Sequence, residues 1–278
     1  MGHAAAVASR CAQVDLDADE LDVLSGELWA AGAVAVQELP LDDRRVRLIA
    51  GFPAEREADV VATMAVHGVV DVFDADHDGW LDAWRPFARP VHVGRVVVQP
   101  PWETVDAVDL HALVVSIDPG RAFGQGNHPT TRLMLALLQD LDLDGARVLD
   151  VGCGSGVLAI ASVLLGAEHA VAIDIEDEAV RVTVENAERN GVSERVEAST
   201  NAVGDLTGVF DVVLANILAP VLIEVAPAIR ARVAPRGRVV LSGFREDQRD
   251  AVVAAYAPLV PVDETFAPEW RLISFRDI

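Results

Sequence analysis

Three glycines at alternate positions, Gly152, Gly154 and Gly156, form the stretch best suited to binding a ligand. They follow residues 147–151, a short apolar and β-branched run that predicts a buried strand, and they precede an apolar helical pattern that begins at Val157. Such a turn gathers backbone N–H groups at a helix N-terminus, where a partial positive charge favours an anionic or hydroxyl-rich ligand. Because glycine has no Cβ, the ligand can approach the main chain closely.

An acidic residue follows the glycine turn at the spacing of a nucleoside site. Residues 169–174 predict a second buried strand that ends on Asp174, about twenty residues beyond the loop. A carboxylate at the tip of a parallel strand can accept hydrogen bonds from both ribose hydroxyls. The alternative is that Asp174 only caps the helix that begins near Asp177. The glycine loop ahead of Asp174 favours the nucleoside site.

The glycine spacing argues against a nicotinamide dinucleotide. The dinucleotide fingerprint is G-x-G-x-x-G, whereas this turn is D-x-G-x-G-x-G, with Asp150 ahead of the first glycine and Val157 in place of the last one. Cys153, inside the turn, is interpreted as a small residue that fits rather than as a nucleophile. Cys153 and Cys11 lie far apart in the chain and are expected to be free thiols, with neither a disulfide nor a metal site.

A second glycine-rich loop precedes the first parallel strand. Residues 116–132 read SIDPGRAFGQGNHPTTR, and His128 followed by Pro129 predicts a helix start. Thr131, in the first turn, can offer its hydroxyl and N–H groups to a carboxylate, or it can belong to a local cap. His128 is either a base or a helix-entry residue whose ring is satisfied locally.

The elements that must position these residues alternate between strands and helices along the second half of the chain. This alternation predicts an α/β fold, a doubly wound and mostly parallel seven-stranded Rossmann-like sheet with helices on both faces. Ligands bind beyond the carboxyl ends of such strands, near the switch point. Gly152, Asp174 and Asn216 all follow or end strands. Asn216, after the apolar strand 210–214, carries a carbonyl and an amino group that can orient an amine or hold a cofactor.

Residues 12 to about 76 predict a separate α+β unit of ferredoxin-like type, with the order strand, helix, strand, strand, helix, strand. The unit carries no catalytic constellation, and we interpret it as a recognition module. Tryptophans and prolines in residues 77–115 are typical of a rigid, packed connector.

Composition limits the classes of function. The chain has 278 residues, of which 51% are hydrophobic and 24% charged, as in a folded protein of one large or two smaller domains. Its net charge of −22 argues against direct nucleic-acid binding and is compatible with a basic protein partner. No apolar run reaches the length of about 18 residues that a membrane span needs, and the first residues do not resemble a signal peptide. We therefore expect a cytoplasmic protein without a membrane partner.

Four motifs together resemble one known family. The loop DVGCGSG with Asp174 is similar to the adenosylmethionine site of class I methyltransferases. More specifically, DPGRAFGQGNHPTT, VLDVGCGSGVLAIA, NAERNG and ANIL resemble the ribosomal protein L11 methyltransferases over about residues 80–278. Gln125 and Asn127 stand where the family usually has the two threonines of FGTGTHPTT. The first unit agrees with that family's small substrate-recognition domain in pattern more than in residues.

The resemblance implies S-adenosylmethionine as the cofactor, with contacts at Thr131, Gly152, Asp174 and Asn216, to which the close approach of the loop adds Gly154. Asn216 is also the expected catalytic residue. The implied domains are a substrate-recognition domain at 1–76, a linker at 77–115 and a methyltransferase domain at 116–278.

The implied reaction is methylation of protein amines, either lysine side chains or the N-terminal amine, on a ribosomal protein of the large subunit. One alternative is a class I methyltransferase that acts on another protein or on a small molecule. Another alternative, of a different class, is a non-catalytic adenosylmethionine-binding module. The sequence does not indicate an oligomeric state.

Overall fold

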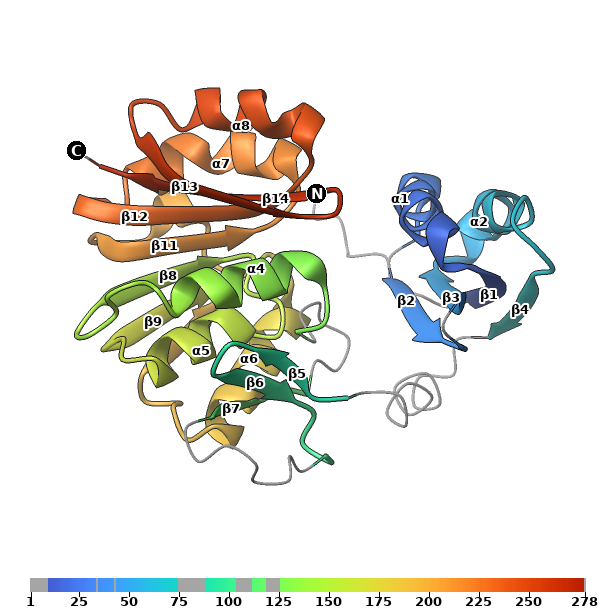
Figure 1. Ribbon diagram of the computed structural model, residues 1–278, viewed down its shortest axis with the longest axis horizontal. Helices are drawn as coiled ribbons and strands as arrows, with labels where there is room; N and C mark the ends of the chain where they lie inside the picture. Colours follow the sequence, from blue (N-terminus) through green and yellow to red (C-terminus); the bar gives the residue numbers. More distant parts are fainter. Residues whose placement is uncertain are drawn as a thin grey trace. The chain divides into compact units, whose positions relative to one another are not determined.

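The computed structural model describes residues 10–33, 35–42, 44–74, 89–103, 112–118 and 126–277. The chain divides into two compact units, Met1–Ala88 and Arg89–Ile278, which are described separately here (Figure 1).

The first unit is a four-stranded antiparallel sheet with two helices. The strand order is β2-β3-β1-β4, which is the ferredoxin-like order and confirms the predicted α+β unit. Each helix follows a short 3₁₀ turn. The elements are β1 (Arg10–Asp17), α1 (Leu21–Ala31), β2 (Ala35–Pro40), β3 (Arg45–Phe52), α2 (Glu57–Met64) and β4 (Asp71–Asp74).

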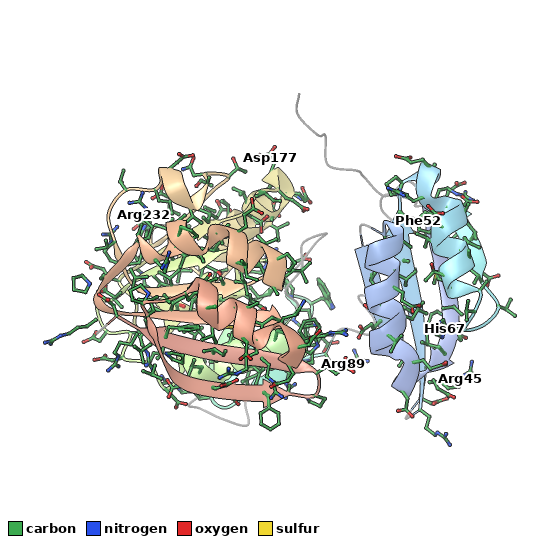
Figure 2. All side chains as sticks on the ribbon, turned by 90° about the horizontal axis from the view of Figure 1, so that it is seen from above. Arg45, Phe52, His67, Arg89, Asp177 and Arg232 are labelled. Atoms are coloured by element: carbon green, nitrogen blue, oxygen red, sulfur yellow. The ribbon has the colours of Figure 1, made fainter. Side chains whose placement is uncertain are left out.

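Strand alternation explains the core of the first unit. Every second residue of β1 and β3 is buried against the helices, because successive side chains of a strand point to opposite faces. Phe52, labelled in Figure 2, is fully buried in this core, whereas Arg45 at the other end of β3 is exposed. The buried strand residues are Ala12, Val14, Leu16, Leu48, Ala50 and Phe52.

The second unit is built on a seven-stranded sheet with the order β10-β9-β8-β11-β12-β14-β13. The first five strands in this order are parallel, and β14 and β13 are antiparallel to their neighbours. The doubly wound, mostly parallel sheet predicted from the sequence is thereby confirmed. The strands are β8 (Arg147–Val151), β9 (His169–Ile173), β10 (Val196–Ser199), β11 (Phe210–Asn216), β12 (Val233–Phe244), β13 (Val260–Ala267) and β14 (Trp270–Arg276).

Helices cover both faces of this sheet (Figure 1). Consecutive strand residues therefore enter two different apolar clusters, as Val148 and Leu149 do. One face carries α4 (Pro129–Leu138), α5 (Val157–Leu164) and α6 (Asp177–Arg189), and the other carries α7 (Ala219–Arg230) and α8 (Arg249–Ala255). Burial on both faces explains why these strands are almost continuously hydrophobic in sequence.

The direction of the chain reverses beside β8. From β8 the chain continues to β9 and β10 on one side, and it then returns to β11 on the other side of β8. This is a topological switch point, where open α/β sheets bind their ligands. The carboxyl ends of β9, β8 and β11 therefore lie side by side at the place where a site is expected.

A small sheet that the sequence analysis did not predict precedes the large one. It has the order β5-β6-β7, with β5 (Val91–Val93), β6 (Val96–Gln99) and β7 (Leu113–Ser116), and it belongs to the second unit. The described part of residues 77–115 therefore contains strands, although we interpreted this segment as a connector. The proposed domain boundaries stay a prediction.

Candidate functional site

The glycine loop leaves β8 through backbone conformations that glycine adopts most easily. Gly152, Gly154 and Gly156 have φ angles of 73°, 53° and 78°, in the left-handed region. A Cβ on Gly152 would clash with Cγ2 of Ile217, so packing as well as conformation favours glycine there. The N–H groups of Gly152 and the next residue donate to the carbonyl of Ile173 at 2.8 and 3.0 Å, which ties the loop to the end of β9.

Asp174 connects the glycine loop to the turn that leads into α6. Its Oδ2 accepts a hydrogen bond from the N–H of Gly154 at 3.0 Å, and its Oδ1 accepts one from the N–H of Glu176 at 3.1 Å. Glu176 is the N-cap of α6, so Asp174 braces the residues ahead of the helix and does not cap its first turn. Each carboxylate oxygen has a second lone pair, which leaves capacity for two ligand hydroxyls.

Ile175, the residue after Asp174, was missed in the sequence analysis. Its side chain is 95% exposed, an unusual position for isoleucine. An apolar surface beside an acid that is predicted to bind a ribose suits the face of a nucleobase, which makes Ile175 a candidate contact for the base. The sequence could not reveal this because Ile175 continues an apolar strand pattern and looks like a core residue.

Asp150, one residue before the end of β8, is a buried acid at the base of the glycine loop. It is 1% exposed; its Oδ2 accepts the N–H of Ala159 at 3.1 Å, and its Oδ1 has no hydrogen-bond partner among the described residues. The pKa of Asp150 is raised to about 7, mainly by burial and to a smaller extent by the charge of Asp174, while the N–H of Ala159 opposes the rise. An incompletely satisfied buried carboxylate favours a ligand that brings positive charge.

Cys153 behaves as the small buried residue that we expected. Its Sγ lies 3.4 Å from Oγ1 of Thr183, and it is not part of a disulfide. Burial raises the pKa of the Cys153 thiol well above its usual value, with a further contribution from the nearby charge of Asp150. The thiol therefore stays protonated, which disfavours a role as nucleophile.

The other half of the site lies where α4 begins and β11 ends. Thr131 is 1% exposed in the first turn of α4, and its Oγ1 lies 3.5 Å from Nδ2 of Asn216, a long and weak hydrogen bond. His128 caps α4, with its Nδ1 accepting the N–H of Thr130 at 3.3 Å. This ring is engaged locally, in agreement with the second of the two interpretations of His128.

An aromatic and cationic cluster adjoins the start of α4. Trp270 begins β14 at the carboxyl edge of the sheet, because β14 runs antiparallel to β12. The Trp270 ring meets the edge of His128 at 5.2 Å between centroids, and the guanidinium of Arg245 lies 5.7 Å from the Trp270 centroid. Arg245 also pairs with Glu269 at 3.7 Å. Nothing in the sequence indicated this cluster, since periodicity carries no signal for a contact with α4.

The predicted site residues therefore form two contacting pairs. Gly154 contacts Asp174, and Thr131 contacts Asn216. Gly152 lies between the pairs, because β8 is hydrogen-bonded to both β9 and β11. Gln125 is outside the described residues. Within the described ranges no three His, Cys, Asp or Glu side chains are grouped as a metal site, and no helix is long and apolar enough to cross a membrane.

A sheet of this order, with a glycine loop after one central strand and an acid after the next, defines the class of Rossmann-like methyltransferases. Comparison with known proteins agrees with this class. Residues 14–277 match the sequence model of the ribosomal protein L11 methyltransferase (PrmA) family. A protein of that name from Citrifermentans bemidjiense is 43% identical over 249 residues, covering 86% of this chain and 80% of the relative. Another protein of that name, from Geotalea daltonii, is 37% identical over 302 residues, covering 95% of this chain and 94% of the relative.

A solved structure shares the fold. The crystal structure of a ribosomal protein L11 methylase from Lactobacillus delbrueckii subsp. bulgaricus superimposes with a TM-score of 0.64 at 31% identity, covering 68% of this chain and all of the other. With the match over residues 14–277, these similarities show that the chain belongs to the ribosomal protein L11 methyltransferase family. It is a methyltransferase whose cofactor is S-adenosylmethionine.

The residues at the sheet edge fit this cofactor chemically. S-adenosylmethionine carries two ribose hydroxyls, an ammonium group, a carboxylate and a sulfonium. Asp174 suits the hydroxyls, and the unpartnered Oδ1 of Asp150 suits positive charge. The helix start at Thr131 suits a carboxylate. The assignment of each residue to a part of the cofactor stays a prediction.

We predict that Asp174→Ala weakens S-adenosylmethionine binding by about 30- to 150-fold. The reason is the loss of two hydrogen bonds to a charged acceptor, worth about 2–3 kcal/mol together. Titration calorimetry measures the dissociation constant. Asp177→Ala is the matched control, because Asp177 is an exposed acid three residues further on, in the first turn of α6 (Figure 2). Unchanged affinity in Asp174→Ala, or an equal loss in the control, would contradict the ribose assignment.

We also predict that Asp150→Asn stabilises the cofactor-free protein by a pH-dependent amount. Because folding raises the pKa of Asp150 from about 3.9 to about 7, the native carboxyl holds its proton more tightly than the unfolded one. The free energy of unfolding of the wild type therefore falls by on the order of a few kcal/mol as pH rises from about 4 to about 7. Above pH 7 this contribution is constant. Asparagine cannot lose that proton, so the variant avoids the fall.

Urea unfolding of wild type and Asp150→Asn at pH 5 and pH 8 measures this difference. The stability gained by the variant is expected to be larger at pH 8 than at pH 5. Any change in packing caused by the amide is the same at both pH values and cancels in the comparison. An equal gap at both pH values would show that Asp150 titrates normally.

Proposed function

We propose that this chain methylates amines of ribosomal protein L11, a protein of the large ribosomal subunit, in the cytoplasm. The amines are lysine side chains, the N-terminal amine, or both. The observation that carries the proposal is the meeting of the Gly154–Asp174 and Thr131–Asn216 pairs at the switch point of a methyltransferase sheet. The names of the relatives support the choice of protein substrate.

In this proposal the cofactor lies across the ends of three neighbouring strands. Asp174 accepts hydrogen bonds from the ribose hydroxyls, and Gly152 and Gly154 allow the main chain to approach closely. Thr131 offers its hydroxyl and N–H groups to the methionine carboxylate at the start of α4. The reacting centre is then between β8 and β11, beside Asn216.

The bound cofactor supplies a methyl group on an activated sulfonium, so the chain has to align the amine rather than form a covalent intermediate. A lysine amine has a pKa of about 10.4, and roughly one in a thousand is neutral near pH 7. Removal from water beside a cation favours the neutral form. With the cofactor held by Asp174 and Thr131, the amine at Asn216 would accept the methyl group in place of the sulfur, and one amine proton would leave to water.

Asn216 is the residue proposed to orient the amine. Its Nδ2 is directed to Oγ1 of Thr131, so its Oδ1 is the atom of the amide that accepts a hydrogen bond from the amine. This bond fixes the direction of the nitrogen lone pair. Asn216 also contacts the cofactor in this arrangement, which is why its two roles need separate measurements.

The acceptor is proposed to enter from the β12 and β14 side. Asp174 follows β9, on the opposite side of β8 from β11, so the cofactor occupies the β9, β8 and β11 ends. Trp270 and Arg245 flank the remaining part of the edge. A tryptophan ring suits the alkyl part of a lysine side chain. The net charge of −22 attracts a basic protein at long range, and residues 1–76 are the proposed recognition domain.

The proposal is tested by incubating the protein with labelled S-adenosylmethionine and unmethylated ribosomal protein L11, followed by mass spectrometry of intact protein and peptides. Label on L11 amines is the expected result, and another basic ribosomal protein is the control for charge alone. Label only on a small molecule would contradict the protein substrate. Cofactor binding without transfer to any acceptor would indicate a binding module.

We predict that Asn216→Ala lowers kcat by about 100-fold while the dissociation constant of S-adenosylmethionine changes less than about threefold. The loss corresponds to about 2.7 kcal/mol of alignment that exists only during reaction. Single-turnover kinetics and calorimetry separate the two quantities. Asn201→Ala, an exposed residue on the chain between β10 and β11, is the control. A pure loss of cofactor affinity would move Asn216 out of the catalytic role.

Trp270→Ala is predicted to lower kcat/KM for the protein acceptor by about tenfold, because about 1.4 kcal/mol of aromatic contact is lost. Cofactor affinity is expected to stay within about twofold. Trp102→Ala removes another partly exposed tryptophan of the same unit and serves as the control. If the dissociation constant of the cofactor changed more than kcat/KM for the protein acceptor, the proposed direction of acceptor entry would be contradicted.

A further inference from the structure

Helix α6 carries a stripe of polar residues on a face turned into the protein. We call Thr183, Asn186 and Asn190 the α6 stripe; Asn190 directly follows the last helical residue. Thr183 and Asn186 are completely buried. Spacings of three and four residues place these side chains on one face. Buried amides and hydroxyls in such a position require hydrogen-bond partners, and these partners identify what the stripe holds.

The two asparagines pair with the extended chain at the end of β7. Asn190 accepts the N–H of Ser116 at 2.8 Å and donates to its carbonyl at 2.7 Å. Asn186 does the same with Asp118, at 3.0 and 2.9 Å. Each side-chain amide thus replaces the peptide group of a neighbouring strand. Ile117, between the two, instead donates its N–H to the carbonyl of Gln99 in β6 at 2.9 Å.

The repeat lengths of helix and strand explain why this pairing works. Four residues of a helix rise about 6 Å, and two residues of a strand extend about 6.6 Å. Asparagines four positions apart on α6 therefore match Ser116 and Asp118, two positions apart on the extended chain. The stripe pairs with the end of β7 on the side that faces away from β6, where an open sheet edge otherwise needs protection.

Asn186 also reaches the glycine loop. Its Nδ2 donates to the carbonyl of Ser155 at 2.9 Å, in addition to Asp118, and its Oδ1 also accepts a hydrogen bond from Arg189. All four hydrogen-bonding positions of this one amide are therefore occupied. Beside it, Oγ1 of Thr183 donates to the carbonyl of Gly154 at 3.1 Å.

These bonds draw two carbonyl groups of the glycine loop toward α6. Carbonyl oxygens carry partial negative charge, and the N–H groups of residues 152–154 are already bonded to Ile173 and Asp174. Because both carbonyls are bonded to α6, the peptide groups of Gly154 and Ser155 cannot rotate without losing these hydrogen bonds. The donors on α6 stabilise the orientation in which the carbonyls of Gly154 and Ser155 are satisfied within the protein.

We propose that Asn186 is a positioning residue of the cofactor site, which fixes the glycine loop and residues 116–118 against each other and holds the loop carbonyls away from the cofactor. The inference rests on the cofactor site proposed above. It separates the roles of the α6 stripe: Thr183 holds only the loop, Asn190 holds only Ser116 and α6 itself, and Asn186 holds both segments.

Three variants of the full chain test this division. Asn186→Ala is expected to raise the dissociation constant and the KM of S-adenosylmethionine about tenfold with kcat nearly unchanged, because the glycine loop loses its connection to residues 116–118. Thr183→Val, which keeps the shape of the side chain, is expected to raise both about threefold. Asn190→Ala is expected to lower the midpoint of urea unfolding while cofactor affinity stays within about twofold.

The measurements are calorimetric titration and steady-state kinetics at a temperature where circular dichroism shows each variant to be folded. Equal cofactor affinity in wild type, Asn186→Ala and Thr183→Val would overturn the inference, and so would an equal loss in Asn190→Ala, which would indicate a purely structural stripe. If Asn186→Ala does not fold, Thr183→Val against Asn190→Ala decides the question. Failure of the wild type to bind the cofactor would instead contradict the proposed function.

Discussion

The hydrogen bonds between the glycine loop and the end of β9 are the constraint on which the rest of the second unit depends. The carbonyl of Ile173 accepts two loop N–H groups, and Asp174 accepts a third. These bonds lie beyond Val151 and Ile173, the last paired residues of the neighbouring strands β8 and β9. They therefore fix the glycine loop relative to the carboxylate of Asp174. Helix α5 then starts from Gly156, and its first turn satisfies one oxygen of Asp150. A change in any one of these contacts alters the others.

The parts of the fold with strong periodicity were predictable. The seven-stranded sheet and the ferredoxin-like unit follow from runs of alternating or continuous apolar residues, separated by glycine and proline, whose local preference agrees with the final structure. The strands β5 to β7 were not predicted because each has only three or four residues. Strands of that length become stable through partners, and β7 finds its partners in β6 and in two asparagine side chains of α6.

The candidate site divides in the same way. The placement of Gly152, Gly154 and Asp174 was predictable because it follows from backbone conformation and from position at strand ends, both of which are local. Asn186 and Trp270 were not, since their importance lies in contacts with segments 68 and 142 residues away in the chain. The motif NAERNG contains Asn186, but only the hydrogen bonds to Asp118 and Ser155 show what the residue holds.

This distribution of side chains matches the chemistry of methyl transfer. An activated sulfonium does not need a strong acid or a covalent nucleophile, and the described site offers neither. His128 is engaged as a helix cap, Cys153 is held protonated by burial, and Asp150 is enclosed at the base of the loop. Polar side chains instead act on the main chain, as the half-buried Asp174 and the buried Asn186 do. Since the reaction depends on how the cofactor is held, rigid placement of the loop contributes through the affinity and position of the bound cofactor.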